Sequence, residues 1–210
     1  MKSTPSPLEP SATTSRRSFV KTMAAASAIP LALSTPAFAS AKSKRKLKVG
    51  MIGCGGRGSW ITPHFLEHGG FEVIAAADYF QDRVDSYRDK FGIEPKSCFT
   101  GLSAYRKLID EADVDAVVIK SPPYFHPEQA TYAVERGKHV YLAKPIAVDA
   151  PGSLSVEESA KTATAKGLTF LVDFQTRTHE YFIEAMRRVH AGELGTLGFG
   201  EAFYHATDPF

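Results

Sequence analysis

Residues 48–58 read K-V-G-M-I-G-C-G-G-R-G, a short apolar run followed directly by a cluster of glycines. A G-x-G-x-x-G pattern alone matches many chains by chance, so its surroundings decide what it means. The run 47–52 is typical of a buried strand, and residues 59–68 can form a helix once the glycines end. A strand, a glycine turn and a helix in this order predict the first unit of a dinucleotide-binding fold.

The glycines have distinct places in such a turn. Gly53 would make the tight turn, Gly55 would let the backbone approach a diphosphate, and Gly58 would let the helix pack closely on the strand. The start of the helix offers free N–H groups and a partial positive charge to the phosphates. We therefore predict cofactor contacts from the whole turn, which comprises Gly53, Gly55, Gly56, Arg57 and Gly58. A glycine-rich turn that binds nothing is the alternative.

An acidic residue follows the glycines at a suitable distance. Residues 71–78 form a second apolar run that ends in Asp78, 20 residues after Gly58. A carboxylate at this place accepts hydrogen bonds from the adenosine ribose and repels a 2′-phosphate. The predicted cofactor is therefore NAD, with NADP less favoured. Without the glycines, Asp78 would more often be the N-cap of a helix over residues 82–91.

The rest of the chain continues to alternate. We expect helices over residues 102–112, 127–136, 151–166 and 180–191, and strands over residues 115–119, 139–142 and 169–174. This alternation predicts an α/β fold, a doubly wound parallel sheet with helices on both faces, which is the Rossmann architecture. Ligands of such sheets bind beyond the carboxyl ends of the strands. Four loops converge there, namely the glycine turn, Asp78, Ser121-Pro122-Pro123 and Lys144-Pro145.

Residues 1–39 resemble an export signal. The charged segment S-R-R-S-F-V-K, residues 15–21, precedes a mildly apolar stretch that ends in the small-x-small pattern of residues 37–39. The paired arginines look like a twin-arginine signal, and the stretch is too short and broken for a stable bilayer span. We expect a periplasmic or secreted protein that uses the twin-arginine export machinery, with residues 40–46 as a basic linker. A disordered basic tail is the alternative.

The composition excludes several classes of function. The 210 residues are 43% hydrophobic and 23% charged, which suits one globular core. Beyond residue 39 the chain has 21 basic and 22 acidic residues, so nothing in its charge favours nucleic acid as a partner. The two cysteines, Cys54 and Cys98, lack metal-ligand spacing, as do His179, His190 and His205. We predict no metal site and disfavour a disulfide.

Four stretches together resemble the glucose–fructose oxidoreductase/inositol dehydrogenase (Gfo/Idh/MocA) family. They are V-G-M-I-G-C-G-G-R-G (49–58), V-D-A-V-V-I-K-S-P-P-Y-F-H-P-E-Q-A (114–130), G-K-H-V-Y-L-A-K-P (137–145) and A-G-E-L-G-T-L-G-F-G (191–200). The resemblance covers nearly everything after residue 46. It implies an NAD(P)-dependent oxidoreductase that transfers hydride between its cofactor and a sugar, cyclitol or glycoside, with a Rossmann domain over residues 47–175.

The resemblance also implies roles for individual residues. Lys144 matches the lysine of a Glu-Lys-Pro motif at the family's active site, which implies proton transfer at the substrate hydroxyl and contact with the cofactor. The segment Ser121, Pro122 and Pro123 would lie against the ribose and nicotinamide, and His126 and Arg177 would lie near them. The alternatives are a solvated lysine, a strand-ending turn, a capping or packing histidine and a surface arginine.

The chain departs from the family pattern in three ways. Ala143 stands where the family has a glutamate, and Lys120 stands where a small residue is more usual. Family members also carry a second α/β domain, whereas residues 176–210 resemble only a connecting helix and a first strand over 199–207. We therefore expect a fragment of a longer polypeptide, a homo-oligomer when full length, whose first 210 residues bind cofactor without turnover. Two alternatives stay open: an NAD-dependent glycosidase acting by transient oxidation and elimination, and a non-catalytic dinucleotide- or sugar-binding protein.

Overall fold

The structure, a computed structural model, describes residues 45–203. Within them, six parallel strands form one sheet in the order β3-β2-β1-β4-β5-β6. The strands are β1 (Leu47–Ile52), β2 (Phe71–Asp78), β3 (Cys98–Thr100), β4 (Ala116–Ile119), β5 (His139–Leu142) and β6 (Phe170–Val172). The strand order reverses between β1 and β4, which opens a crevice at their carboxyl ends.

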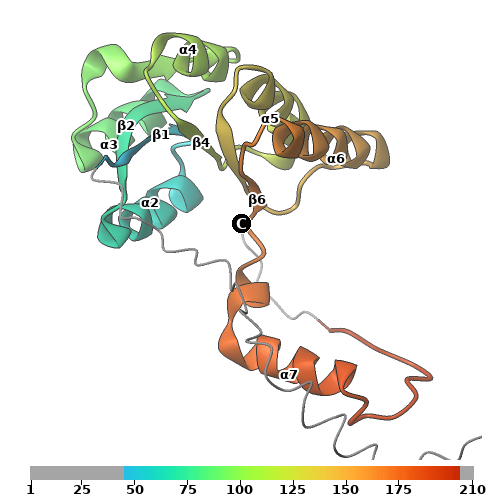
Figure 1. The fold of residues 1–210 in the computed structure, drawn as a ribbon. Coiled ribbons are helices and arrows are strands. Elements are labelled where there is room, and N and C mark those ends of the chain that lie inside the picture. The colour runs from blue at the N-terminus through green and yellow to red at the C-terminus, as the bar shows by residue number, and fades with distance from the viewer. Residues whose placement is uncertain (1–44, 204–210) are drawn as a thin grey trace, which may run out of the picture. The chain divides into compact units, whose positions relative to one another are not determined.

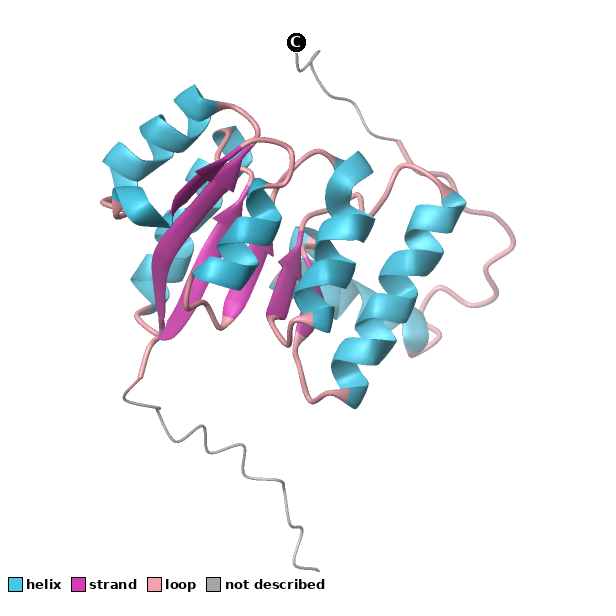
Figure 2. Ribbon diagram, turned by 90° about the horizontal axis from the view of Figure 1, so that it is seen from above, coloured by secondary structure: helices cyan, strands magenta, loops and turns pink. Residues whose placement is uncertain are grey.

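Helices cover both faces of this sheet (Figures 1 and 2). They are α2 (Gly56–His68), α3 (Gln81–Phe91), α4 (Ala104–Glu111), α5 (His126–Glu135) and α6 (Ala150–Ala165). Helix α7 (Glu180–His190) follows the last strand and buries none of its residues, and short 3₁₀ helices lie at Pro95–Ser97, Pro123–Phe125 and Gln175–Thr178. Helices α2 and α3 pack on one face, and α4, α5 and α6 pack on the other. The predicted doubly wound α/β fold is confirmed.

The strands are apolar throughout because both of their faces are buried. On β4, Val117 and Ile119 join the core cluster under α4, α5 and α6, whereas Val118 between them joins the cluster under α2 and α3. Successive side chains of a strand point to opposite faces, so a strand covered on both sides has no polar alternation. This pattern lies behind the correct assignment of the central strands from the sequence.

Apart from shifts of one or two residues at the ends of several elements, three details differ from the sequence prediction. Helix α2 begins at Gly56, inside the glycine turn, rather than at Ser59. The edge strand β3 was not predicted, because three residues carry too little periodicity to be recognised. The strand expected over residues 199–207 is not formed in its described part, 199–203, where no neighbouring strand pairs with it.

Several other predictions concern residues outside the described range. The export signal and most of the linker lie in residues 1–44, and the end of the expected last strand lies in residues 204–207. None of the helices in residues 45–203 combines the length and the apolar character that a bilayer crossing requires. Cys54 and Cys98 are both free thiols.

Candidate functional site

The glycine turn connects β1 to α2 and packs against the end of β4. Gly53 has φ +96°, and a Cβ there would lie 2.5 Å from backbone atoms of Lys120 and Ser121. A Cβ on Gly58 would lie 2.1 Å from the carbonyl oxygen of Gly53. Gly55, by contrast, has open space where its Cβ would be, at the start of α2. Two of the glycines are therefore required by backbone packing, and Gly55 leaves room for a ligand.

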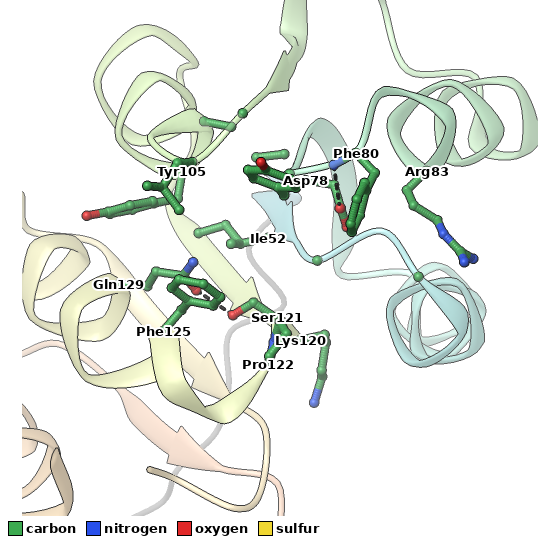
Figure 3. Close-up of a pocket in the computed structure, with 17 residues that line it drawn as sticks. Ile52, Asp78, Phe80, Arg83, Tyr105, Lys120, Ser121, Pro122, Phe125 and Gln129 are labelled. Carbon is green, nitrogen blue, oxygen red and sulfur yellow. Dashed lines mark hydrogen bonds between the residues drawn. The ribbon is translucent and has the colours of Figure 1, made fainter. Parts of the chain in front are cut away.

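Asp78 fixes the turn at the carboxyl end of β2. One carboxylate oxygen accepts a 2.7 Å hydrogen bond from the backbone N–H of Cys54, and the other accepts one of 3.1 Å from that of Phe80. The N-cap residue of α3 is Phe80, so Asp78 does not have the capping role that was the alternative. Its carboxylate instead faces both the glycine turn and the adjacent cavity (Figure 3).

A cavity of about 430 Å³ lies at the carboxyl ends of β1, β2 and β4. Five residues predicted from the sequence line it: Gly53, Gly55, Asp78, Ser121 and Pro122. Lys120, noted in the sequence as a departure from the family pattern, lines it too. The other lining residues were not predicted and are mostly apolar or aromatic: Ile52, Ala77, Tyr79, Phe80, Arg83, Gly101, Leu102, Ala104, Tyr105, Phe125 and Gln129. The volume and the apolar walls suit a small organic ligand. The aromatic pair directly after Asp78 is the signal that could have revealed this wall.

His126 joins two loops at this edge of the sheet. Its ring is fully buried, with Nε2 2.8 Å from the carbonyl oxygen of Ser121 and Nδ1 2.9 Å from that of Pro145. Both ring nitrogens thus face backbone acceptors, which leaves neither for the cofactor contact predicted from the sequence. Burial lowers the pKa of His126, and the two carbonyl groups oppose this shift. The residue holds the loop after β4 against the loop after β5.

The remaining predicted residues lie outside the cavity lining. Lys144 is exposed at the second position after β5, and its peptide bond to Pro145 is cis. Arg177 is exposed, with its guanidinium 5.1 Å from the centre of the Phe174 ring, and Pro123 begins a 3₁₀ helix. Gly56, Arg57 and Gly58 form the first turn of α2 beside the cavity.

A buried ion cluster at the same edge was not anticipated. Asp173, which directly follows β6, is 6% exposed and accepts hydrogen bonds from Lys120 Nζ at 2.8 Å and from Arg57 at 3.0 Å. These residues come from three distant parts of the sequence and meet only because of the strand order. Among the described residues, no group of three ligating side chains could hold a metal ion.

The comparisons with known proteins agree with this geometry. A family profile described as "Oxidoreductase family, NAD-binding Rossmann fold" matches residues 47–174. The chain is 35% identical to inositol 2-dehydrogenase 4 of Saccharopolyspora erythraea, over 73% of this chain and 44% of that protein. It is 25% identical to a glycosyl hydrolase family 109 protein of Porphyromonas gingivalis, over 86% of this chain and 41% of that protein.

Solved structures show the same likeness. Scyllo-inositol dehydrogenase from Lactobacillus casei, with bound NAD(H) and scyllo-inositol, is 26% identical with a TM-score of 0.59, over 72% of this chain and 43% of that one. Another neighbour, a 3-ketoreductase from Actinomadura kijaniata, was solved with NADP, so both forms of the cofactor occur among the neighbours. The chain spans less than half the length of these relatives. It belongs to the Gfo/Idh/MocA family of oxidoreductases, which is characterised by an NAD-binding Rossmann fold.

Proposed function

We propose that the chain binds NAD(H) in the cavity and serves hydride transfer to or from a carbinol carbon of a sugar, cyclitol or glycoside. The proposal rests on one observation: Asp78 and Gly55, which has open space where its Cβ would be, line the same cavity. The first offers acceptor oxygens to ribose hydroxyls, and the second lets a diphosphate approach backbone N–H groups at a helix start. A bound nicotinamide supplies the carbon that accepts or donates hydride.

The cavity residues support NAD over NADP. The charge of Asp78 would repel a 2′-phosphate, whereas the guanidinium of Arg83 in the same wall would attract it. Asp78 is the nearer of the two to the glycine turn, because it hydrogen-bonds the Cys54 N–H of that turn. Tyr79 and Phe80 are 60% and 59% exposed beside it and can cover one side of the adenine.

Lys144 is the residue that we propose for proton transfer. It stands at the carboxyl end of β5, and its exposed ammonium is free to meet a substrate hydroxyl beyond the sheet edge. His126 holds the following residue, Pro145, by its carbonyl oxygen. The lysine loop is thereby tied to the loop that contains Ser121, which lines the cavity.

The relatives named as glycosyl hydrolase family 109 proteins favour a second candidate, a glycosidase that oxidises its substrate transiently and then eliminates the aglycone. Incubation of the full-length polypeptide with glycosides and with free sugars separates the two activities by their products. An oxidised or reduced sugar supports the dehydrogenase, and a released aglycone with no net cofactor change supports the glycosidase. If the cofactor absorbance at 340 nm never changes on addition of substrate and no aglycone appears, the protein binds without catalysis.

We further propose export by the twin-arginine route to the periplasm or the medium. The support is the S-R-R-S-F-V-K segment followed by an apolar stretch. Outside the cytoplasm a cofactor that is held tightly and regenerated in place suits the chemistry better than one drawn from a free pool. We propose equally that the substrate is a sugar, cyclitol or glycoside and that the full-length protein forms a homo-oligomer.

The binding proposal is tested at Asp78. Replacement by alanine removes the ribose acceptor and frees the Cys54 N–H, so we expect at least a tenfold loss of NADH affinity, measured by fluorescence titration. The Asp78→Asn variant keeps the size of the side chain and removes its charge, so it should raise the affinity for NADPH relative to NADH. Asp89→Asn, on the exposed side of α3 away from the cavity, is the matched control. Unchanged NADH affinity in Asp78→Ala contradicts the ribose role.

A further inference from the structure

Two members of the ion cluster, Lys120 and Asp173, lie in a single row of the sheet. Ile119, Leu142 and Val172 are register partners across β4, β5 and β6. The next residue of each strand therefore forms the following row, at the carboxyl edge: Lys120, Ala143 and Asp173. Because β5 lies between β4 and β6, the Lys120 side chain passes the end of β5 to reach Asp173.

Ala143 makes this crossing possible. It precedes Lys144 and stands where the family pattern has a glutamate, and its methyl group leaves space for the lysine stem. Tyr141 lies two residues before Ala143 on the same face of β5. Its ring makes a cation–π contact with Lys120, whose Nζ lies 4.4 Å from the ring centre. The two residues that depart from the family pattern, Lys120 and Ala143, therefore both contribute to the Lys120–Asp173 ion pair.

A second cation comes from the glycine turn itself. Arg57 donates to Asp173 at 3.0 Å and to Gln175 Oε1 at 3.2 Å, and its guanidinium lies 4.3 Å from the centre of the Trp60 ring. The Arg57 side chain is 37% exposed, whereas the Lys120 side chain is entirely buried. The first turn of α2 is thereby fixed to the end of β6.

The cluster carries more positive than negative charge. Asp173 is the carboxylate that acts on Lys120, and Arg57 acts on the same group as a second cation. Burial lowers the pKa of Lys120 while Asp173 opposes the shift, and the bonds from Lys120 and Arg57 lower the pKa of Asp173 against its burial. Burial and the charge of Asp173 raise the pKa of Tyr141 to about 12, so its phenol is neutral. Two cations thus face one carboxylate.

This excess charge lies along the candidate cofactor site. Lys120 lines the cavity, and its side chain points away from the aromatic residues of the wall (Figure 3) to donate a hydrogen bond to Asp173. Arg57 lies between two glycines of the turn. A dinucleotide with its ribose at Asp78 runs along the same edge of the sheet, past the switch between β1 and β4.

We propose that the Arg57–Asp173–Lys120 cluster makes this site bind reduced nicotinamide dinucleotide more tightly than the oxidised form. NAD⁺ and NADH carry the same diphosphate, so the attraction between the cluster and the phosphates is common to both. The oxidised ring alone carries a positive charge, and an uncompensated cation in a poorly solvated setting repels it. The inference rests on the proposed NAD(H) site, and it assigns a function to the lysine that departs from the family pattern.

The test measures the ratio of the dissociation constants of NAD⁺ and NADH on the purified chain. NADH is titrated by its fluorescence, and NAD⁺ by competition with NADH. Lys120→Met keeps the stem and leaves the pair Arg57–Asp173, so the ratio should fall roughly fivefold. Arg57→Gln, which changes a partly exposed side chain, leaves the pair Lys120–Asp173, so the ratio should fall in the same direction. Structural damage alone weakens both forms and leaves the ratio unchanged.

Lys138→Met is the matched control. Lys138 precedes β5 at the opposite edge of the sheet, where its Nζ donates to the carbonyl oxygen of Val114 at 2.9 Å. Its loss removes the same charge and should leave the ratio at the wild-type value. If both forms bind and neither Lys120→Met nor Arg57→Gln shifts the ratio, the inference is wrong while the NAD(H) site stands. If the wild-type chain binds neither form, the proposed function and the inference both fail.

Discussion

At the scale of the residue, the glycine turn separates a requirement of packing from a requirement of binding. A Cβ on Gly58 would collide with the Gly53 carbonyl oxygen, whereas a Cβ on Gly55 would meet no atom within 4 Å. Gly55 has φ −71° and ψ −163°, which alanine adopts without strain. The two positions therefore make opposite predictions about stability, although both belong to one motif.

We expect Gly58→Ala to lower the free energy of unfolding by about 2 kcal/mol or more, because the collision is with backbone and α2 must move away from β1. Gly55→Ala should stay within about 0.5 kcal/mol of the wild type. Its methyl group nevertheless projects into the space where a diphosphate would approach, so NADH affinity should fall at least tenfold. Urea denaturation and fluorescence titration on each variant measure the two effects. A Gly55→Ala variant that binds NADH as the wild type does argues against a diphosphate at this glycine.

At the scale of the element, the site depends on two loops that His126 ties together at the start of α5. A neutral imidazole has one N–H to donate, yet both ring nitrogens face carbonyl oxygens, those of Ser121 and Pro145. A protonated ring would satisfy both, but burial opposes the charge and lowers the pKa of His126. The folded ring thus takes up its proton at lower pH than the unfolded chain does.

The sign of the pH dependence follows from this lowered pKa. Above about pH 6.5, the ordinary value for histidine, both states are neutral and His126 adds no pH dependence. Below it the unfolded chain gains a proton that the folded ring refuses, so stability is lost as the pH falls. When the pH falls from 7.5 to 5.5, the free energy of unfolding of His126→Asn should therefore fall by about 1 kcal/mol less than that of the wild type. At pH 7.5 the variant should itself be less stable by about 1–3 kcal/mol, since a buried carbonyl loses its donor.

Urea denaturation at the two pH values measures this difference. His64→Asn, which replaces a mostly exposed histidine on α2, is the matched control and should keep the wild-type slope. Equal slopes in the wild type and in His126→Asn would show that the buried ring does not resist protonation.

Elements with a regular apolar pattern could be predicted from the sequence, and contacts that depend on strand order could not. The strands at Leu47–Ile52 and Phe71–Asp78 begin and end where the sequence placed them, because each is a buried run bounded by turn residues. Lys120 and Asp173 are 53 residues apart, and their pairing needs the order and the register of β4, β5 and β6. His126 was recognised, but its buried position between two carbonyl groups depends on the path of the loop after β5.

At the scale of the whole molecule, the carboxyl edge of one sheet gathers every part of the candidate site. The glycine turn follows β1, Asp78 ends β2, Ser121 follows β4 and Lys144 follows β5. A parallel sheet directs all its carboxyl ends to the same side, so short loops suffice to bring these residues together. The aromatic wall at Tyr79 and Phe80 was missed because exposed aromatic residues in a loop have no periodic signature.

The cellular location is a property of the whole polypeptide, and the proposed export signal is tested by changing its paired arginines, Arg16 and Arg17. A twin-arginine signal depends on the guanidinium pair, so replacing both Arg16 and Arg17 by lysine keeps the charge and removes the recognition feature. We expect the full-length chain with both changes to stay in the cytoplasmic fraction of a bacterial host and to keep residues 1–39, as seen by immunoblot after fractionation. The matched control is the adjacent pair Arg187 and Arg188 on α7, whose replacement by lysine should leave export unchanged. Export of the Arg16→Lys, Arg17→Lys chain at the wild-type level would exclude the twin-arginine route.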